Sequence, residues 1–303
     1  MKKLLLFFSL ALLASFGFAN VADYTFGYSA GTYTEITEGT VLGTAIVGGS
    51  GDASLDNVLY TGVPLPFLFG FNGRRYNQIA VNSNGYLIIG GNTSISESAP
   101  LSTAGTADGV ISPIGKDNQG NTTEGNLGQI RYQILGASPN QIFVIQWKNF
   151  RHYGETGANY NFQIQLYEGS NLIKFVYGPM TMSTTSRACQ VGLRGTSPSD
   201  FINRASTTDW TATTAGTSNT ATITLSQTVY PPNGCTYTWT PNTPTTYPNL
   251  ATVVYPTNGA TTIPVSANLS WADGGGWTDN FKLYLGTTNG DTNPPWNMVN
   301  GSD

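Results

Sequence analysis

The chain contains a single histidine, His152, within the sequence Arg151-His-Tyr-Gly-Glu155. Any Ser-His-Asp or Cys-His mechanism would have to use this imidazole. The two cysteines are expected to be structural, so we interpret His152 as a surface histidine of a loop or strand end. The stretch is still a candidate ligand site, because an exposed aromatic such as Tyr153 can stack on a sugar ring. We therefore predict Arg151, His152, Tyr153 and Glu155 as ligand-binding residues and expect no catalytic residue.

Carboxylates are the next groups that could do chemistry. Asp117, Glu124 and Glu155 are candidates for the acid pair of a glycosidase, which needs two carboxyl groups about 5 to 9.5 Å apart across a cleft. Sequence alone does not bring any two of them together. We interpret them as solvated loop acids, and a glycan-active enzyme stays open as an alternative.

Two oxygen-rich stretches could hold calcium, which needs several converging oxygen ligands. They are Gly51-Asp-Ala-Ser-Leu-Asp-Asn57 and Asp117-Asn118. Neither matches the ligand spacing of an EF-hand loop. We therefore expect no cofactor, with a structural calcium ion as the alternative.

Cys189 and Cys235 are the only cysteines of the chain. Each alternates with apolar residues and would lie on the buried face of a strand. If the two strands are neighbours, a disulfide forms in an oxidising compartment. We predict this disulfide, and two buried free thiols are the alternative.

The elements that would position these residues are strands. Between Gln129 and Tyr177, three runs alternate apolar and polar side chains with a period of two, as in half-buried strands. Turn-forming sequences separate the runs. We predict four consecutive antiparallel strands in this stretch. Trp147 alternates with Phe143 and Ile145, and we expect it in the core.

A second strong pattern runs from Val63 to Ile89. Asn72-Gly73 and Asn84-Gly85 separate its alternating runs, and Asn-Gly is the strongest short hairpin signal. We predict a three-strand meander, whose first strand is at a sheet edge because it contains Pro64 and Pro66. Shorter strands are predicted at 23–28, 32–36, 41–47, 111–114, 187–194, 219–226, 228–230 and 235–240, and polar loops at 48–56 and 116–128.

Frequent short strands without an amphipathic helix predict an all-β fold, an antiparallel β-sandwich of jelly-roll type, over residues 22–240. Residues 241–249 contain prolines among threonines and read as a semi-rigid linker. A second β unit follows at 250–303, with strands at 253–255, 269–271 and 281–285.

The composition of the chain limits the classes of binding partner. Only 10% of the residues are charged and the formal net charge is −4, against about 25% charged residues in typical soluble domains. An acidic chain without a Lys/Arg cluster has no electrostatic footprint for nucleic acid. It also lacks a polybasic patch for an anionic membrane surface.

The N-terminus predicts export. Met1-Lys-Lys3 is basic, residues 4–16 are apolar, and Gly17-Phe-Ala19 has small residues at the positions that precede a cleavage site. The apolar run is shorter than the roughly 20 residues of a membrane-spanning helix. We therefore predict a signal peptide at 1–19 and no membrane span after its removal.

Two family resemblances add to this reading. The second unit resembles the start of a fibronectin type III or immunoglobulin-like module in 256–260, 263–265, 269–271 and 281–286, where Trp271 and Tyr284 match core positions. The resemblance implies a complete module of about 100 residues, so the chain is expected to be a fragment of a longer protein.

The first unit resembles the N-terminal β-sandwich of large secreted proteins of Bacteroidetes-type bacteria, many of which use type IX secretion. The stretches that carry this resemblance are 31–36, 63–90, 142–150, 162–178, 191–195, 200–204 and 237–241. The loop near Lys116 departs from it, because related sequences often have an aromatic and acidic run there. The resemblance implies a secreted or cell-surface context and no particular reaction.

Together, these features predict a non-catalytic, exported surface or matrix module for adhesion or for binding an extracellular glycan or protein. The alternative is an accessory domain of a secreted hydrolase whose catalytic domain lies beyond residue 303.

Overall fold

The computed structural model describes residues 20–91, 98–105, 107, 109–242 and short stretches between 252 and 299. The chain divides into two compact units, of which the larger spans Ala19–Pro244 and the other includes Thr245–Asp303. The predicted signal peptide and most of the predicted linker lie outside the described residues. No helix among the described residues is long and apolar enough to cross a bilayer.

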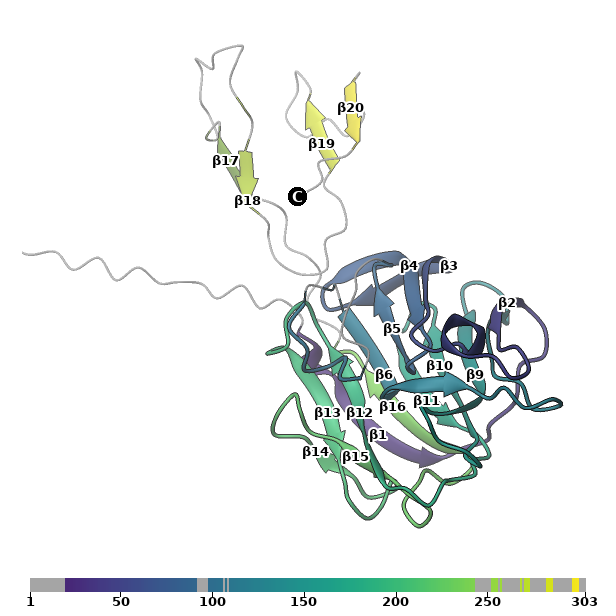
Figure 1. The fold of residues 1–303 in the computed structure, drawn as a ribbon. Coiled ribbons are helices and arrows are strands. Elements are labelled where there is room, and N and C mark those ends of the chain that lie inside the picture. Colours follow the sequence, from purple (N-terminus) through teal and green to yellow (C-terminus); the bar gives the residue numbers. More distant parts are fainter. Residues whose placement is uncertain are drawn as a thin grey trace, which may run out of the picture. The chain divides into compact units, whose positions relative to one another are not determined.

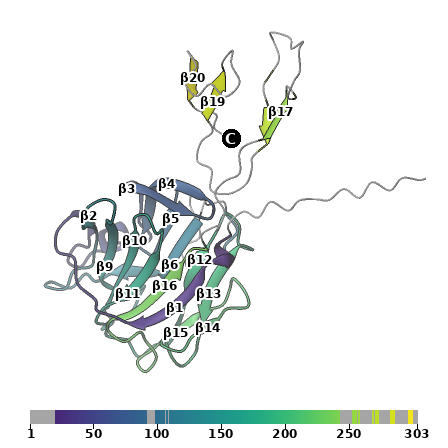
Figure 2. The same cartoon turned by 180° about the vertical axis from the view of Figure 1, so that it is seen from behind.

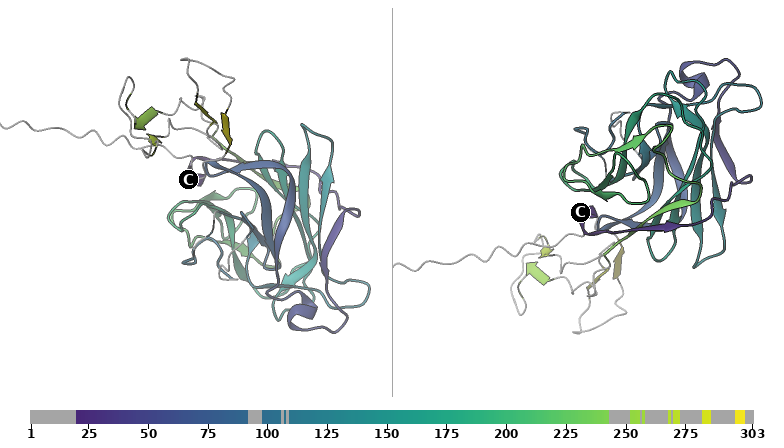
Figure 3. Two further views of the ribbon diagram at one scale, coloured as in Figure 1. Left: turned by 90° about the horizontal axis from the view of Figure 1, so that it is seen from above. Right: turned by 90° about the horizontal axis from the view of Figure 1, so that it is seen from below.

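The larger unit is a sandwich of two antiparallel sheets (Figures 1 and 3). Sheet A has the order β1 (Thr25–Ala30), β16 (Cys235–Thr240), β11 (Ile173–Tyr177), β10 (Tyr160–Tyr167), β9 (Ile142–His152), β8 (Gln129–Leu135) and β2 (Thr40–Thr44), and β7 (Asn118–Gly120) also pairs with β9. Sheet B has the order β14 (Thr214–Ala215), β13 (Phe201–Ala205), β12 (Arg187–Arg194), β6 (Gly109–Gly115), β5 (Tyr86–Ile89), β4 (Arg74–Asn82) and β3 (Leu59–Phe71), and β15 (Ile223–Leu225) also pairs with β12.

The all-β sandwich predicted from the sequence is therefore confirmed. The four predicted strands between Gln129 and Tyr177 are β8 to β11, which are neighbours in sheet A; Figure 2 shows β9, β10 and β11 side by side. The meander is β3 to β5, with β3 at the edge of sheet B as its prolines indicated. Asn72 and Gly73 both have positive φ, 51° and 77°, which is the backbone that the hairpin turn requires.

The core lies between the sheets and is rich in aromatic side chains. The inward residues of β9 and β10, including Trp147 and Phe162, are fully buried. These two rings stack with centroids 5.1 Å apart. The Trp147 indole nitrogen donates to the carbonyl oxygen of Asn82 on β4 at 3.0 Å, which links the two sheets. Each buried side chain of this size contributes about 1.5–3 kcal/mol relative to an exposed one.

The first and last strands of the unit are neighbours. β1 and β16 pair in antiparallel register from Thr25 opposite Thr240 to Ala30 opposite Cys235. Phe26 of β1 packs against Trp239 and Tyr237 of β16, with ring centroids 5.0 and 5.1 Å apart. The chain therefore enters and leaves the larger unit at the same end of one strand pair.

Several segments differ from the sequence-based prediction. Residues 32–36 form no strand, because they cross the face of sheet A and their backbone bonds to side chains instead of to a neighbouring strand. The predicted loop 48–56 contains a short 3₁₀ helix, η2 (Gly51–Ser54), and another, η1 (Val21–Asp23), precedes β1. The predicted loop 116–128 contributes β7, which pairs with the end of β9.

The predicted disulfide between Cys189 and Cys235 is wrong, since both residues are buried free thiols. Cys189 lies on β12 of sheet B and Cys235 on β16 of sheet A, so their strands are not neighbours in one sheet. Burial raises the pKa of both thiols, that of Cys235 to about 12. Thiols of this kind are inert and act as small hydrophobic side chains.

The other unit contains two strand pairs in its described residues. β17 (Thr252–Tyr255) pairs with β18 (Ser270–Ala272), and β19 (Lys282–Leu285) pairs with β20 (Trp296–Val299). The first three are close to the predicted strands, and β20 was not predicted. Most of the proposed fibronectin-like module lies outside the described residues.

Candidate binding site

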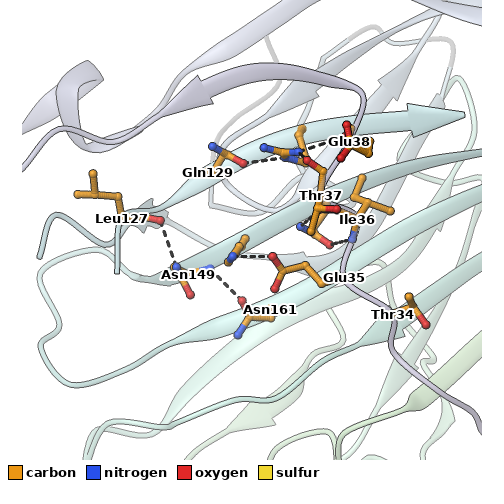
Figure 4. A network of polar contacts seen from close by, with 12 residues as sticks. Thr34, Glu35, Ile36, Thr37, Glu38, Leu127, Gln129, Asn149 and Asn161 are labelled. Carbon is orange, nitrogen blue, oxygen red and sulfur yellow. Dashed lines mark hydrogen bonds and ion pairs between the residues drawn. The ribbon is translucent and has the colours of Figure 1, made fainter. Parts of the chain in front are cut away.

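An extended segment, residues 31–38, crosses the outer face of sheet A, and we call it the strap (Figure 4). The buried amide of Gln146 on β9 holds its middle. The Gln146 Oε1 accepts from the Ile36 backbone N–H at 2.9 Å and from the Tyr33 hydroxyl at 3.0 Å. The Gln146 Nε2 donates to the Ile36 carbonyl oxygen at 3.2 Å. The Gln146 side chain thus makes the hydrogen bonds that a neighbouring strand would otherwise make to the backbone of the strap.

Further side chains hold the rest of the strap. Gln163 on β10 donates to the carbonyl oxygen of Thr34 at 2.7 Å and to Gln146 Oε1 at 2.9 Å. Lys148 and Glu35 form an ion pair at 2.5 Å. Arg131 on β8 donates to the carbonyl oxygens of Thr37 and Glu38. Because strands β8, β9 and β10 all contribute, the strap is fixed to the sheet.

Beside the strap lies a cavity of about 340 Å³, which we call the strap cavity. Its walls carry amides, hydroxyls and one carboxylate, together with the apolar side chains of Ile36 and Leu135. The lining residues are Thr32, Thr34, Glu35, Ile36, Thr37, Gln133, Leu135, Gln163 and Gln165.

A second cavity, of about 360 Å³, lies where β9 ends, and we call it the loop cavity. Its lining comes from the loop after β7, the end of β9, the loop before β10 and Thr181 after β11. The lining residues are Asn121, Thr123, Asn126, Arg151, Thr156, Gly157, Ala158, Asn159 and Thr181.

Asparagine side chains fix the walls of the loop cavity. Asn121 Nδ2 donates to the Ala158 carbonyl oxygen at 3.2 Å and to Asn159 Oδ1 at 3.4 Å. Asn159 Nδ2 in turn donates to Asn149 Oδ1 at 3.3 Å. Asn149 has the left-handed φ of 57°, and its backbone N–H donates to Asn161 Oδ1 at 3.0 Å (Figure 4). The left-handed conformation is one that asparagine tolerates better than most residues.

Arg151 brings the positive charge to this cavity. It follows the buried Phe150 on β9, so alternation points its side chain to the outer face of sheet A. With the Gln119 amide turned so that its oxygen faces Arg151, Oε1 accepts from Nε at 3.2 Å and from Nη2 at 3.1 Å. Gln119 and Arg151 are opposite each other in the pairing of β7 with β9.

His152 points away from Arg151 and is not part of the loop cavity. Its Nδ1 lies 2.8 Å from the carbonyl oxygen of Tyr153 and donates to it in the tautomer that is protonated there. Burial lowers the pKa of His152, and the charges of Arg187 and Lys116 lower it further. The Tyr153 carbonyl and the Glu155 charge oppose this shift. The neutral imidazole is therefore favoured.

Glu155 is buried, with only 6% of its surface exposed. Its carboxylate forms an ion pair with Arg187 of β12 at 2.9 Å. This pair links the loop after β9 to sheet B. Glu155 therefore has a structural partner and does not face the loop cavity.

Tyr153 is 51% exposed. It lies in a loop whose two ends, at Arg151 and at 156–159, line the loop cavity. Of the four predicted ligand-binding residues, Arg151 lines the loop cavity, whereas Tyr153 lies in the adjoining loop and does not line it. His152 and Glu155 lie on the other side of the strand end.

The predicted carboxylate pair is not formed by Glu155, which faces Arg187. Asp117 and Asp52 instead both act on Asp56, whose pKa is raised by burial and by these two negative charges. These acids belong to the two stretches considered for calcium. Among the described residues, no group of three or more His, Cys, Asp or Glu side chains is arranged to hold a metal ion.

One more sequence, Gly27-Tyr-Ser-Ala-Gly31, has the G-x-S-x-G spacing of a nucleophile elbow. An elbow needs a sharp turn from a strand into a helix. Ser29 instead lies inside the edge strand β1, opposite Thr236 in the ladder. Because this context is missing, the motif does not identify a nucleophile.

Comparison with known proteins adds the family. Residues 23–241 match the model of the family described as NIDO related. Comparisons with curated proteins and with solved structures gave no match. The matched range contains both sheets, the strap and both cavities, and domains of this family are of the extracellular type. The chain belongs to the NIDO-related family.

Proposed function

We propose that this NIDO-related domain is a non-catalytic recognition module of a secreted or cell-surface protein. It binds an extracellular glycan, or a glycan-bearing protein, through the outer face of sheet A. The observation that carries the proposal is the pair of cavities beside the strap and at the end of β9, whose walls combine apolar groups with amides and hydroxyls. Such groups match the hydrogen-bonding pattern of sugar hydroxyls, since each amide offers both a donor and an acceptor.

Rigidity supports the same proposal. The Gln146, Gln163 and asparagine side chains hold the cavity walls in place before any ligand arrives. A preorganised site loses less conformational entropy on binding. The exposed ring of Tyr153 supplies an apolar face next to polar groups, which is the combination that sugar rings require.

Wider context belongs to the proposal as well. We propose export by the type IX route and a fibronectin type III module after residue 249. The support for both is the sequence resemblance described above.

The proposal is tested by measuring the binding of the purified chain to a broad panel of extracellular glycans and matrix glycoproteins. We expect specific binding that Tyr153→Ala weakens about two- to ten-fold, the range for loss of an aromatic contact. Tyr230→Ala is the matched control, because Tyr230 is 39% exposed and lies between β15 and β16, outside the loop that adjoins the loop cavity. A chain that binds nothing on the panel, or that loses binding equally in both variants, contradicts the proposal.

A further inference from the structure

Arg151 is the only charged residue among those that line the loop cavity. The other lining side chains that carry polar groups are asparagines and threonines. The local charge of the cavity is therefore positive, although the whole chain has a formal net charge of −4. A single cation in a neutral polar cavity selects for a ligand with a negative group.

The guanidinium is oriented but not neutralised. Gln119 Oε1 is a neutral acceptor and takes the edge formed by Nε and Nη2. Lys148 pairs with Glu35 and Arg187 with Glu155, and among the residues that the structure describes no carboxylate pairs with Arg151. The remaining edge of the guanidinium, with one N–H from each Nη, is free of a charged partner. This end-on pair of donors has the geometry for a carboxylate or a sulfate.

The surroundings do not cancel this charge. The nearby carboxylate of Glu155 is turned to Arg187 and buried. Asn126, which lines the cavity with Arg151, contributes an amide instead of an acid. Thr123, Thr156 and Thr181 contribute hydroxyls. One anionic group and several hydroxyls on the ligand would satisfy this set.

We propose that the loop cavity binds an acidic saccharide, with its carboxylate or sulfate group on Arg151 and its hydroxyls on the asparagine and threonine side chains. This proposal rests on the proposed function and names the ligand class for one of its two cavities. The strap cavity, which contains Glu35 and no cation, does not share this preference.

The test compares three soluble polymers by isothermal titration calorimetry with the full chain: polygalacturonate, dextran sulfate and uncharged dextran. We expect an acidic polymer to bind and its affinity to fall with ionic strength, because salt screens charge interactions. Arg151→Gln should weaken that binding about ten- to hundred-fold, the range for loss of a hydrogen-bonded charge contact. Arg151→Lys should retain part of it, because lysine keeps the charge but not the paired donors.

Two matched variants separate recognition from general charge effects. Arg74→Gln makes the same charge change at an exposed position of sheet B and should leave binding unchanged. Asn126→Asp puts a negative charge into the cavity without touching Arg151 and should also weaken binding. Its control is Asn140→Asp, at an exposed turn between β8 and β9.

The possible results are distinct. Binding of polygalacturonate alone assigns a carboxylated sugar, and binding of dextran sulfate alone assigns a sulfated one. Acidic-polymer binding that survives both Arg151→Gln and Asn126→Asp overturns the inference. Tyr153-dependent binding of uncharged glycans without any binding of an acidic polymer also overturns the inference but leaves the proposed function intact. If the chain binds no glycan and no polymer, both the inference and the proposed function are contradicted.

Discussion

Glu155 and Arg187 form an ion pair of unequal burial. The Glu155 side chain is 4% exposed, and that of Arg187 is 34% exposed. Neither Glu155 oxygen has an aligned hydrogen bond among the described residues, so the cation alone compensates the buried charge. Removing the charge of Arg187 and removing the charge of Glu155 should therefore have different effects on stability.

Arg187→Gln should destabilise the protein more than Glu155→Gln does. The first change leaves a buried carboxylate without a cation, whereas the second leaves a cation that can reach water. We expect a loss of about 2 kcal/mol for Arg187→Gln, below the 3–5 kcal/mol of a fully buried pair, and about half of that for Glu155→Gln. Urea denaturation of both variants and of the double variant measures this order. Equal losses would contradict the structural role assigned to Glu155.

The protonation of His152 makes the stability of the folded protein depend on pH. Its pKa in the folded protein is below the ordinary value of 6.5. The unfolded chain therefore binds more protons in the pH window just below 6.5, and the free energy of unfolding falls as pH falls through that window. Titration of the single imidazole by proton NMR should give a midpoint below 6.5.

The variant His152→Gln isolates this contribution. When the pH falls from about 7.5 to about 5.5, a range that brackets the ordinary histidine pKa, this variant should lose less stability than the unmodified chain. An imidazole midpoint at or above the ordinary value would show that burial does not dominate.

At the scale of elements, the strap depends on one amide. Gln146 is fully buried, and its Oε1 accepts from Ile36, Tyr33 and Gln163. Because the strap has no ladder of its own, these bonds take the place of secondary structure. They also fix Ile36 and Gln163, which line the strap cavity.

Gln146→Met should release the strap. Methionine has a similar size but does not replace the amide oxygen as an acceptor. The Ile36 N–H and the Tyr33 hydroxyl therefore lose this acceptor, while Gln163 keeps its bond to Thr34, at a cost of about 2 kcal/mol. Hydrogen exchange at the Ile36 amide should become faster by at least ten-fold. Gln165→Met is the control, because among the described residues Gln165 bonds to the Gln163 and Tyr167 side chains and not to the strap. Unchanged exchange at Ile36 in Gln146→Met would show that other contacts hold the strap.

The strap also marks where sequence-based prediction ends. Period-two alternation located β8 to β12 and β16 because each strand carries its own signal in neighbouring residues. Residues 32–36 have the same β-forming composition, yet their partners are side chains more than a hundred positions away. Composition cannot distinguish a strand from an extended segment whose hydrogen bonds end on glutamines.

The candidate site was predictable only in part, for a related reason. Arg151 and Tyr153 stand out because charged and aromatic residues are adjacent in the sequence. Asn121, Asn126 and Asn159 carry no such signal. They meet Arg151 because β7 and β10 both pair with the end of β9, and that register is a property of the folded sheet.

At the scale of the whole larger unit, the β3 edge of sheet B is protected against further strand pairing. Pro64 and Pro66 lie in the edge strand β3, and the β3–β4 pairing is irregular around Tyr60–Val63 and Pro64–Phe69. Proline and bulges hinder the addition of another strand. The long β3 edge of sheet B is therefore a poor template for aggregation.

The pairing of β1 with β16 determines how the larger unit responds to a pulling force. Thr25 and Thr240 face each other at one end of the pair, so tension applied before β1 and after β16 acts on the same end. The backbone hydrogen bonds between β1 and β16 are then loaded one after another, in the unzipping geometry, and not all at once, in the shear geometry. Under tension, this strand pair would peel open from Thr25 and Thr240 toward Ala30 and Cys235 and expose Trp239 early, so a tethered module would yield gradually at its own point of attachment.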